Sequence, residues 1–346
     1  MLSTMKKFYI LMLSILSLPL ALFGGILLAY TRNRRRASSF YDVDGHPRDD
    51  GTRLILSPIR VLEVLPLIDW YAAREDLETE SGVSYLVQAD DTTILFDLGL
   101  NRKGEKEPPL LHNMERLGID PAGIDFVVLS HPHGDHAGGF KNQFAHRAIV
   151  RLEDDPFAGK PVYTTVPLKL THGMSIVVRE PRILAPGIAT LGPLPRALFL
   201  MGYVQEQALA INVQGKGLVL LVGCGHPGIE ALVERAEQLF ALPVYGVIGG
   251  LHFPVTDDRA HIGPIRFQQL LGSPNPPWRP IGKDAVYCTL AYLKAKGVHF
   301  VAPSAHDTCD WSLHAFEEAF GVEYHSLKVG ERLRIEEKSY AQQTNR

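Results

Sequence analysis

The stretch FVVLSHPHGDHAGGF, residues 126–140, places three histidines and one aspartate directly behind an apolar run. His131 and His133 are two residues apart, so an extended or tightly turned backbone can direct both imidazoles at one ion. Asp135 and His136 follow a glycine turn and are free to serve a second ion nearby. Imidazole and carboxylate ligands together suit Zn²⁺, and less exclusively Fe or Mn. The stretch therefore predicts a metal site at the end of a buried strand.

The chain as a whole has ordinary globular composition. Its 346 residues are 46% hydrophobic and 21% charged, which is enough length for one large domain or two small ones. The net charge of -3 offers no general attraction to nucleic acid, so no such partner is expected. The three cysteines, Cys224, Cys288 and Cys309, are too few and odd in number for a disulfide framework.

The N-terminus departs from this average. Residues 8–30 carry no charge, and a helix of that length can cross a hydrocarbon core of about 30 Å. A secretory signal peptide is the competing interpretation, but the apolar run is longer than usual and no clear small-residue cleavage site follows it. We therefore expect one N-terminal transmembrane helix. The arginines of residues 32–36 favour a cytoplasmic domain, although Lys6 and Lys7 act in the opposite direction.

The rest of the chain is interpreted as a linker and one domain. Residues 1–36 form the predicted membrane anchor with its basic flank, and the polar residues 37–52 lack apolar periodicity and are expected to be a linker. Residues 53–346 contain no second long apolar run, low-complexity tract or repeat. One domain is the simplest partition of this part.

Short apolar runs alternate with helical candidates along this domain. Strands rich in Val, Ile, Leu and Phe are expected at residues 53–65, 83–89, 92–99, 124–136, 147–153, 207–214, 217–226, 244–253 and 298–306. Helices are expected at residues 108–118, 226–241, 284–297 and 313–321. The alternation indicates an α/β layered fold with helices packed over buried sheets. Loops at strand ends are where a rigid sheet usually presents functional groups.

Other strand ends should supply the remaining ligands, because two histidines do not complete a coordination sphere. His226 and His306 are the best candidates, since each follows an apolar run, and His252 has the same placement. One strand-end histidine alone is as often incidental as functional, but the repeated placement favours ligands. The other histidines are expected at the surface or in packing: His46, His112, His146, His172, His261, His299, His314 and His325.

The H-x-H-x-D-H signature after a strand, with L-F-D-L-G before it, resembles the metallo-β-lactamase superfamily. A closer likeness is to the branch of the 7,8-dihydropterin-6-yl-methyl-4-(β-D-ribofuranosyl)aminobenzene 5'-phosphate synthases, often described only as metal-dependent hydrolases. The matching motifs span most of residues 80–310 in order: E-S-G-V-S (80–84), L-F-D-L-G (95–99), S-H-P-H-G-D-H-A-G-G-F (130–140), A-P-G-I-A-T-L-G-P-L-P-R (185–196), E-Q-A-L (206–209), G-C-G-H-P-G-I (223–229), I-G-G-L-H (248–252) and P-S-A-H-D-T (303–308).

The resemblance implies a four-layered αβ/βα sandwich with a site for two divalent metals, Zn²⁺ first and Fe or Mn as alternatives. It also implies two sets of ligands, one for each ion: His131 and His133 with a later histidine, and Asp135 and His136 with His306. Asp97 is expected to orient the ligand loop from behind, which is support that ligating imidazoles usually need.

The chain departs from the superfamily where many members bridge the two ions with an aspartate. Residues 222–224 read V-G-C at this place, and His226 follows two positions later. The choice between Cys224 and His226 for the coordinating role stays open, and Cys224 and His252 are candidates for contacts with either metal or substrate. Residues 254–283 are an extra stretch that is expected to form a flap over the site.

The expected chemistry follows from the metals. Two cations allow a bound hydroxide near neutral pH and stabilise negative charge on the attacked centre, while Asp135 orients the nucleophile or accepts its proton. Cys224 as a catalytic thiolate is the weaker alternative. We expect a metal-dependent hydrolase acting on a small-molecule ester, lactone or phosphoester. The alternatives are a pterin-linked synthase, with Arg182 and Arg196 as phosphate-binding candidates, and a non-catalytic metal-binding membrane protein. Substrate, metal identity and oligomeric state stay open.

Overall fold

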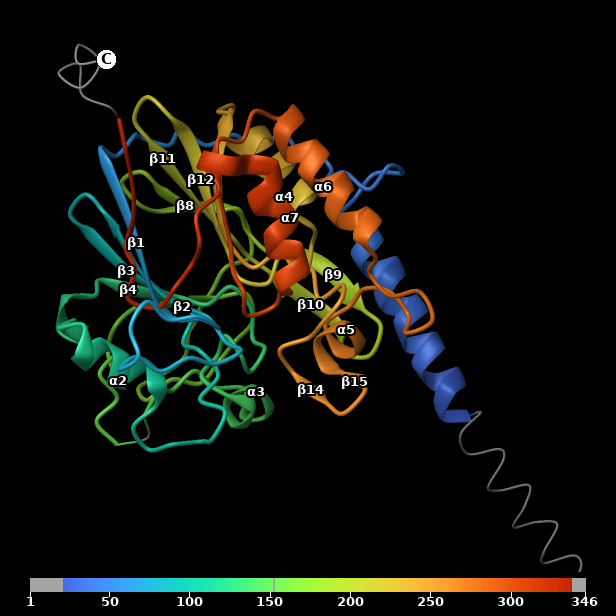
Figure 1. The fold of residues 1–346 in the computed structure, drawn as a ribbon, viewed down its shortest axis with the longest axis horizontal. Coiled ribbons are helices and arrows are strands. Elements are labelled where there is room, and N and C mark those ends of the chain that lie inside the picture. Colours follow the sequence, from blue (N-terminus) through green and yellow to red (C-terminus); the bar gives the residue numbers. More distant parts are fainter. Residues whose placement is uncertain (1–20, 152, 338–346) are drawn as a thin grey trace, which may run out of the picture.

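The computed structural model of the chain describes residues 21–151 and 153–337, and it consists of two stacked sheets with helices outside them (Figure 1). The first sheet has the strand order β17-β1-β2-β3-β4-β5-β6. Its strands are β1 (Val61–Ile68), β2 (Ser84–Ala89), β3 (Thr92–Phe96), β4 (Phe126–Val128), β5 (Val162–Thr164), β6 (Ile176–Val177) and β17 (Leu333–Glu336).

The second sheet has the strand order β16-β13-β12-β11-β8-β7. Its strands are β7 (Arg182–Ala185), β8 (Ile188–Thr190), β11 (Leu209–Val213), β12 (Gly217–Val222), β13 (Val244–Gly249) and β16 (Phe300–Pro303). Two further pairs stand apart from the sheets: β9 (Leu194–Leu198) with β10 (Gly202–Glu206), and β14 (His261–Ile262) with β15 (Ile265–Arg266).

The helices form the outer layers. They are α2 (Pro109–Arg116), α3 (Phe140–Ala145), α4 (Ile229–Phe240), α5 (Phe267–Leu271), α6 (Lys283–Ala295) and α7 (Asp310–Phe320), with short 3-10 turns η1 (Pro121–Gly123) and η2 (Gly321–Glu323). The outer face of the first sheet packs against α2, and that of the second packs against α4, α6 and α7 (Figure 1).

The two-residue period of a strand explains why both faces of each sheet are buried. In β12, Val219 and Leu221 belong to the apolar core between the sheets, whereas Leu218 and Leu220 pack toward the outer helices. Each fully buried Val or Leu contributes roughly 1.5–3 kcal/mol through removal from water. The layers are therefore helix, sheet, sheet and helix, as the expected αβ/βα sandwich requires.

The parallel strands determine where the polar loops meet. β3, β4 and β5 are parallel in the first sheet, and β12, β13 and β16 are parallel in the second. In open α/β sheets, ligands bind outside the carboxyl ends of such strands. The loops that begin at Asp97, Leu129, Gly223, Gly250 and Ser304 all leave such an end. The ends of both sheets thus supply one common edge.

Two expected strands differ from the structure. The run at residues 53–65 becomes a strand only from Val61. Before it, Leu56 and Ile59 are buried but Ile55 is exposed, and the backbone pairs at a single isolated bridge, Ile59 with Val213. Residues 147–153 form no strand among the described positions, and the run pairs only through Arg147 with Lys169. The Arg151 guanidinium instead pairs with Glu107 at 2.7 Å, at the surface.

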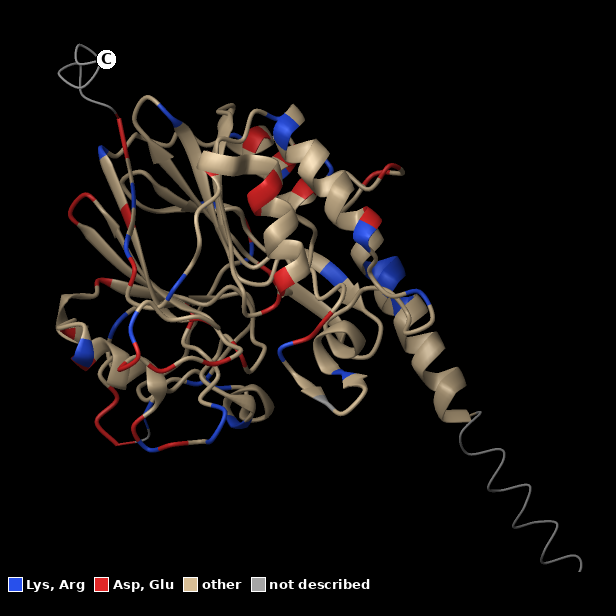
Figure 2. Ribbon diagram, viewed as in Figure 1, with Lys and Arg blue, Asp and Glu red and all other residues tan. Residues whose placement is uncertain are grey.

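The N-terminal segment is helical over residues 21–38, with its arginines toward the domain and its outer turns uncharged (Figure 2). Between residues 21 and 337, no described helix is both long and apolar enough to cross a membrane. Residues 8–20 of the predicted span lie outside the described residues. The expected linker packs on the domain: the Tyr41 hydroxyl donates to the Pro195 carbonyl at 2.9 Å, and Asp50 pairs with Arg235 at 2.9 Å.

Candidate metal centre

Seven of the side chains singled out from the sequence lie together at the common sheet edge. They fall into two groups, and within each group the possible ligand atoms lie within 4.8 Å of one another. The first group contains His131, His133 and His226, and the second contains Asp135, His136, Cys224 and His306. We call these the histidine group and the mixed group. Cys224 and His226, between which the sequence left the coordinating role open, lie in different groups.

Asp97 lies behind the ligand loop, where it was expected. It is fully buried with φ of 62°, and its carboxylate accepts the Ser130 N–H at 2.7 Å and the Ser130 hydroxyl at 2.8 Å. His136 Nδ1 lies 2.7 Å from the same carboxylate. Because the Ser130 hydroxyl donates to Asp97, the nearby His131 Nδ1–H donates to its oxygen at 2.9 Å. Both rings are thus oriented with Nε2 toward the centre.

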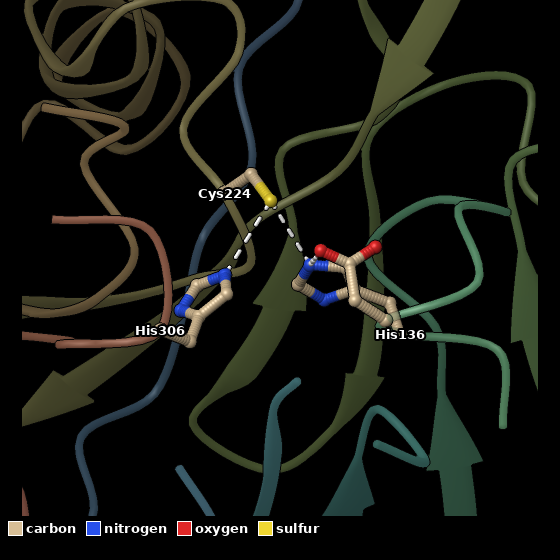
Figure 3. Close-up of side chains that lie close together, drawn as sticks. His136, Cys224 and His306 are labelled. Atoms are coloured by element: carbon tan, nitrogen blue, oxygen red, sulfur yellow. Dashed lines mark hydrogen bonds and ion pairs between the residues drawn. The ribbon is translucent and has the colours of Figure 1, made fainter. Parts of the chain in front are cut away.

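His306 is oriented by a parallel chain of hydrogen bonds. Its Nδ1 lies 2.6 Å from the Ser304 hydroxyl, which donates to Asp69 at 2.6 Å, and the Tyr85 hydroxyl donates to the same carboxylate at 2.9 Å. Cys224 Sγ then lies 3.5 Å from His306 Nε2 and 3.0 Å from His136 Nε2 (Figure 3). The sequence reasoning missed Asp69, although it directly follows strand β1 as Asp97 follows β3.

Glu206 holds the loop that carries Cys224 and His226. This fully buried carboxylate accepts the backbone N–H groups of Cys224, Gly225 and His226 at 3.0, 2.8 and 2.8 Å. The neighbouring Gln207 binds the other ligand loop, through its N–H to the Ser130 carbonyl at 2.9 Å. From the sequence, this glutamate was noted only as part of a motif, because a buried carboxylate between two loops has no local pattern.

Close approach of the two ligand loops explains one glycine. A Cβ on Gly223 would overlap the Ser130 side chain, so any larger residue would separate the loops. The two loops come from different sheets, after β12 and β4. The centre therefore depends on contact between the sheets as well as on each loop.

The histidine group is uncharged, and two of its ring nitrogens make no hydrogen bond to the described residues. Burial and then the neighbouring imidazoles hold the pKa of His131 and His226 well below the ordinary value, and burial lowers the pKa of His133 to about 4. His131 Nε2 and His226 Nδ1 are buried and lack a hydrogen-bond partner in the described part of the chain. Leaving such an atom unpaired costs about 1–3 kcal/mol, which a metal ligand bond offsets.

The mixed group concentrates negative charge. Burial and then the carboxylates of Asp135 and Asp307 raise the pKa of the Cys224 thiol well above its ordinary value. Against the effect of burial, Asp135 and Asp97 raise the pKa of His136 to about 9. A free Cys224 thiolate is disfavoured here, whereas a bound cation reverses that preference. Nitrogen, sulfur and carboxylate donors together fit a divalent ion such as Zn²⁺.

Both groups open into one cavity of about 320 Å³. Its polar floor includes His133, Asp135, Cys224, His226 and His252, and its apolar walls include Leu100, Phe140, Met201, Phe267 and Leu271. The extra stretch at residues 254–283 supplies one wall through β14 and α5, as expected of a flap. This segment is attached to the loop after β16, because Gln268 donates to the His306 carbonyl and Arg259 to the Ala305 carbonyl at 3.0 Å.

The basic side chains in the cavity lining differ from the candidates chosen from the sequence. Neither Arg182 nor Arg196 lines the cavity, and Arg182 instead lies over the Tyr163 ring at 5.7 Å. The arginine in the lining is Arg102, which the sequence reasoning did not select. His261, expected only at the surface or in packing, is exposed and also lines the cavity.

Comparisons with known proteins agree with this geometry. Residues 77–198 match the family model of the metallo-beta-lactamase superfamily. Over 237 residues the chain is 27% identical to 7,8-dihydropterin-6-methyl-4-(beta-D-ribofuranosyl)-aminobenzene-5'-phosphate synthase of Methanocaldococcus jannaschii, covering 56% of this chain and 78% of the synthase. It is 28% identical over 176 residues to the N-acyl homoserine lactonase AiiB of Agrobacterium fabrum, covering 45% of this chain and 58% of the lactonase.

A solved structure has a similar fold. It is that of Tm1679, described as a metal-dependent hydrolase of the beta-lactamase superfamily, with a TM-score of 0.55 and 20% identity. The match covers 80% of this chain and all of that one. The matched family model, the H-P-H-G-D-H loop and the αβ/βα layers together make residues 77–198 of this chain similar to the metallo-β-lactamase superfamily.

Proposed function

We propose that the chain is a metal-dependent hydrolase with a dinuclear centre, acting on a small-molecule ester, lactone or phosphoester. One observation carries the proposal: two ligand groups, with four and three donors, lie side by side on the floor of a single cavity. A structural metal site is closed, whereas a catalytic one keeps a position open for water or substrate. The volume of about 320 Å³ is at the lower end of the range of small-molecule sites, roughly 300–1,000 Å³.

Divalent cations in these groups, when bound, supply an acidified water and stabilise negative charge that develops on the substrate. His131, His133 and His226 would hold one ion, and His136, Cys224 and His306 with Asp135 the other. Asp135 is the one member of the mixed group that is not buried, with 26% of its side chain exposed, and it lines the cavity. It is therefore placed to orient the attacking water and to accept its proton.

The cavity walls favour a substrate with an apolar part. Phe140, Phe267 and Leu271 surround the floor, so an aliphatic or aromatic substituent can bury against them while the reacting group lies over the ligands. Burial of this part also excludes water from the reaction, which strengthens the electrostatic interactions there.

Synthase activity is the second candidate, because the M. jannaschii relative is named for it. A ribosyl-arene phosphate substrate requires a cation near the cavity, and Arg102 is present in the lining. An Arg102→Ala variant separates the two candidates: the synthase hypothesis expects a large rise in KM for a phosphorylated substrate. An uncharged ester hydrolysed by the same protein should be nearly unaffected.

We also propose that residues 8–30 anchor the chain in a membrane, with the domain on the cytoplasmic side. The support is the uncharged run itself and the arginines that follow it. Sedimentation with membranes that resists alkaline carbonate but not detergent tests the anchor. Degradation of the domain by protease added to intact cells would contradict the proposed side.

The hydrolase proposal is tested with zinc-reconstituted protein on a panel of model esters, lactones and phosphoesters. We expect turnover on at least one class and its loss in His133→Ala, because that side chain belongs to the histidine group and lines the cavity. His314→Ala is the control, since this histidine is exposed and pairs with Glu318. Full turnover in His133→Ala would remove the mechanism, and metal binding without turnover on any substrate would favour the non-catalytic alternative.

A further inference from the structure

We propose that Cys224, His252 and Asp307 form a third cation site, which shares the Cys224 sulfur with the mixed group. The inference rests on the proposed function, because it assumes that Cys224 is a metal ligand. The ligand atoms of these three buried residues lie within 4.8 Å of one another. They come from three different strand ends, after β12, β13 and β16, so no single loop accounts for their proximity.

His252 is a buried imidazole with no hydrogen-bonding role. The residue is 6% exposed, and neither ring nitrogen has a hydrogen-bond partner within the described ranges. The residue lines the cavity, and its ring centroid lies 5.0 Å from that of His226. An imidazole with two unpaired nitrogens costs free energy unless something binds a lone pair. A cation is the ligand that the neighbouring thiol and carboxylate would also favour.

The ring is held in place from the flap side. A Cβ on Gly272 would overlap the His252 ring, so the wall packs directly on the imidazole and only glycine leaves room for it. The backbone of His252 has φ of 53°, a conformation that side chains other than glycine seldom adopt. Strain of this kind costs about 1–3 kcal/mol and is typical of functional sites.

The third donor, Asp307, is 1% exposed and lies beside this ring. Its Oδ2 accepts the His252 backbone N–H at 3.1 Å, and its Oδ1 accepts the Thr308 hydroxyl at 3.0 Å. The same Oδ2 is 3.8 Å from His252 Nδ1, which is too far for a hydrogen bond. Two ligands bound to one zinc at about 2.0–2.2 Å lie about 3–4 Å apart, so this separation suits a shared ion.

The donor set restricts the type of ion. Thiolate and imidazole favour Zn²⁺, Fe²⁺ or Co²⁺ over Mg²⁺ or Ca²⁺, which prefer oxygen ligands. The ion should bind more weakly than the other two, because it has three protein ligands and shares one of them. It would lie at the flap side of the cavity, where it can contact an anionic substituent of the substrate.

Zinc content at controlled free zinc tests the proposal. We expect the full chain to bind three equivalents, the third with the weakest affinity, and Asp307→Asn to bind two with the two tightest affinities unchanged. In the cobalt-loaded protein, the sulfur-to-cobalt absorption band should remain in this variant, because Cys224 still binds the ion of the mixed group. Asp258→Asn is the matched control, since this buried flap carboxylate accepts the Ala260 and Gln269 N–H groups but lies outside the three donors.

The outcomes distinguish the third site from the dinuclear centre. Two equivalents in both the unmodified chain and Asp307→Asn would overturn the third site and leave the proposed function standing. Fewer than one equivalent in the unmodified chain would overturn both. If Asp307→Asn fails to fold, anomalous diffraction from zinc-loaded crystals of the unmodified chain decides: a peak within coordination distance of Asp307 and His252 supports the site, and its absence overturns it.

Discussion

The two ligand groups of the centre differ in how their side chains are held. In the mixed group, side chains orient side chains: Asp97 contacts His136, and Asp69 contacts His306 through Ser304. In the histidine group, the Ser130 hydroxyl also orients the His131 ring, but His226 is placed by its backbone, whose N–H binds Glu206, while its ring has a nitrogen without a partner among the described residues.

The difference predicts unequal responses to change. The mixed group carries acidic donors, so its affinity for an ion depends on charge and on proton release. The histidine group contains only imidazoles with lowered pKa values, so its affinity depends on position. Substitutions that change charge should therefore affect mainly the ion affinity of the mixed group. Substitutions that displace the backbone should affect mainly the ion affinity of the histidine group.

The largest effect is expected for Asp135→Asn, which retains the shape of the side chain and removes its charge. Loss of a positioned general base typically reduces the rate by about 10²–10⁴-fold, and the mixed group also loses an anionic donor. We expect kcat to fall by this factor while the histidine group keeps its ion. Steady-state kinetics measures kcat, and zinc analysis measures the ions that stay bound. An unchanged kcat would remove Asp135 from the mechanism.

Glu206→Gln tests the role of backbone position. A glutamine oxygen can still accept the Cys224 and Gly225 N–H groups, but its amide N–H₂ faces the His226 N–H, which displaces that residue. We expect about 10–100-fold weaker zinc binding at the histidine group, as for other residues that support ligands. A chelator competition assay in a His136→Ala background reports this group alone.

Glu80→Gln is the matched control for this experiment. Glu80 is also a buried glutamate that accepts three backbone N–H groups, those of residues 100–102, and it does not belong to either ligand group. Both variants should lose a similar free energy of unfolding, about 1–3 kcal/mol. Equal loss of zinc affinity in both would show that Glu206 acts only through stability.

The pH dependence of zinc binding should also differ between the groups. In the ion-free chain the pKa of His136 is about 9 and that of Cys224 is well above its ordinary value, so an ion entering the mixed group displaces protons below pH 9. Affinity should rise with pH by about tenfold per unit for each proton released. The pKa of His133 is about 4, so binding by the histidine group should change little between pH 6 and 8.

Titrations at pH 6.5, 7.5 and 8.5 measure this difference, with His226→Ala to isolate the mixed group and His136→Ala to isolate the histidine group. Parallel pH profiles for the two variants would contradict the distinction between the groups. This is the smallest of the expected effects, because only one or two protons are involved.

Much of the fold and of the ligand set could be predicted from the sequence. The H-P-H-G-D-H loop and the histidines after apolar runs are local patterns, and the parallel strands bring them to one edge. That Cys224 and His226 lie in different ligand groups could not be predicted, because it depends on how the two sheets meet. Asp69 follows a strand as Asp97 does and was within reach of the same reasoning.

Other features had no local signal. Glu206 is identified as a support only when its three backbone partners are seen. Residues 147–153 are apolar enough for a strand, yet their described positions pair only through Arg147 with Lys169. Arg102 reaches the cavity from the loop after β3, a position that spacing along the chain does not reveal.

Each ligand group is proposed to hold its own divalent ion. Anomalous diffraction at the zinc edge, from crystals of the zinc-loaded chain, tests it most directly. We expect one peak among His131, His133 and His226 and a separate peak among Asp135, His136, Cys224 and His306. A single peak between the groups, or no peak at either, would contradict it.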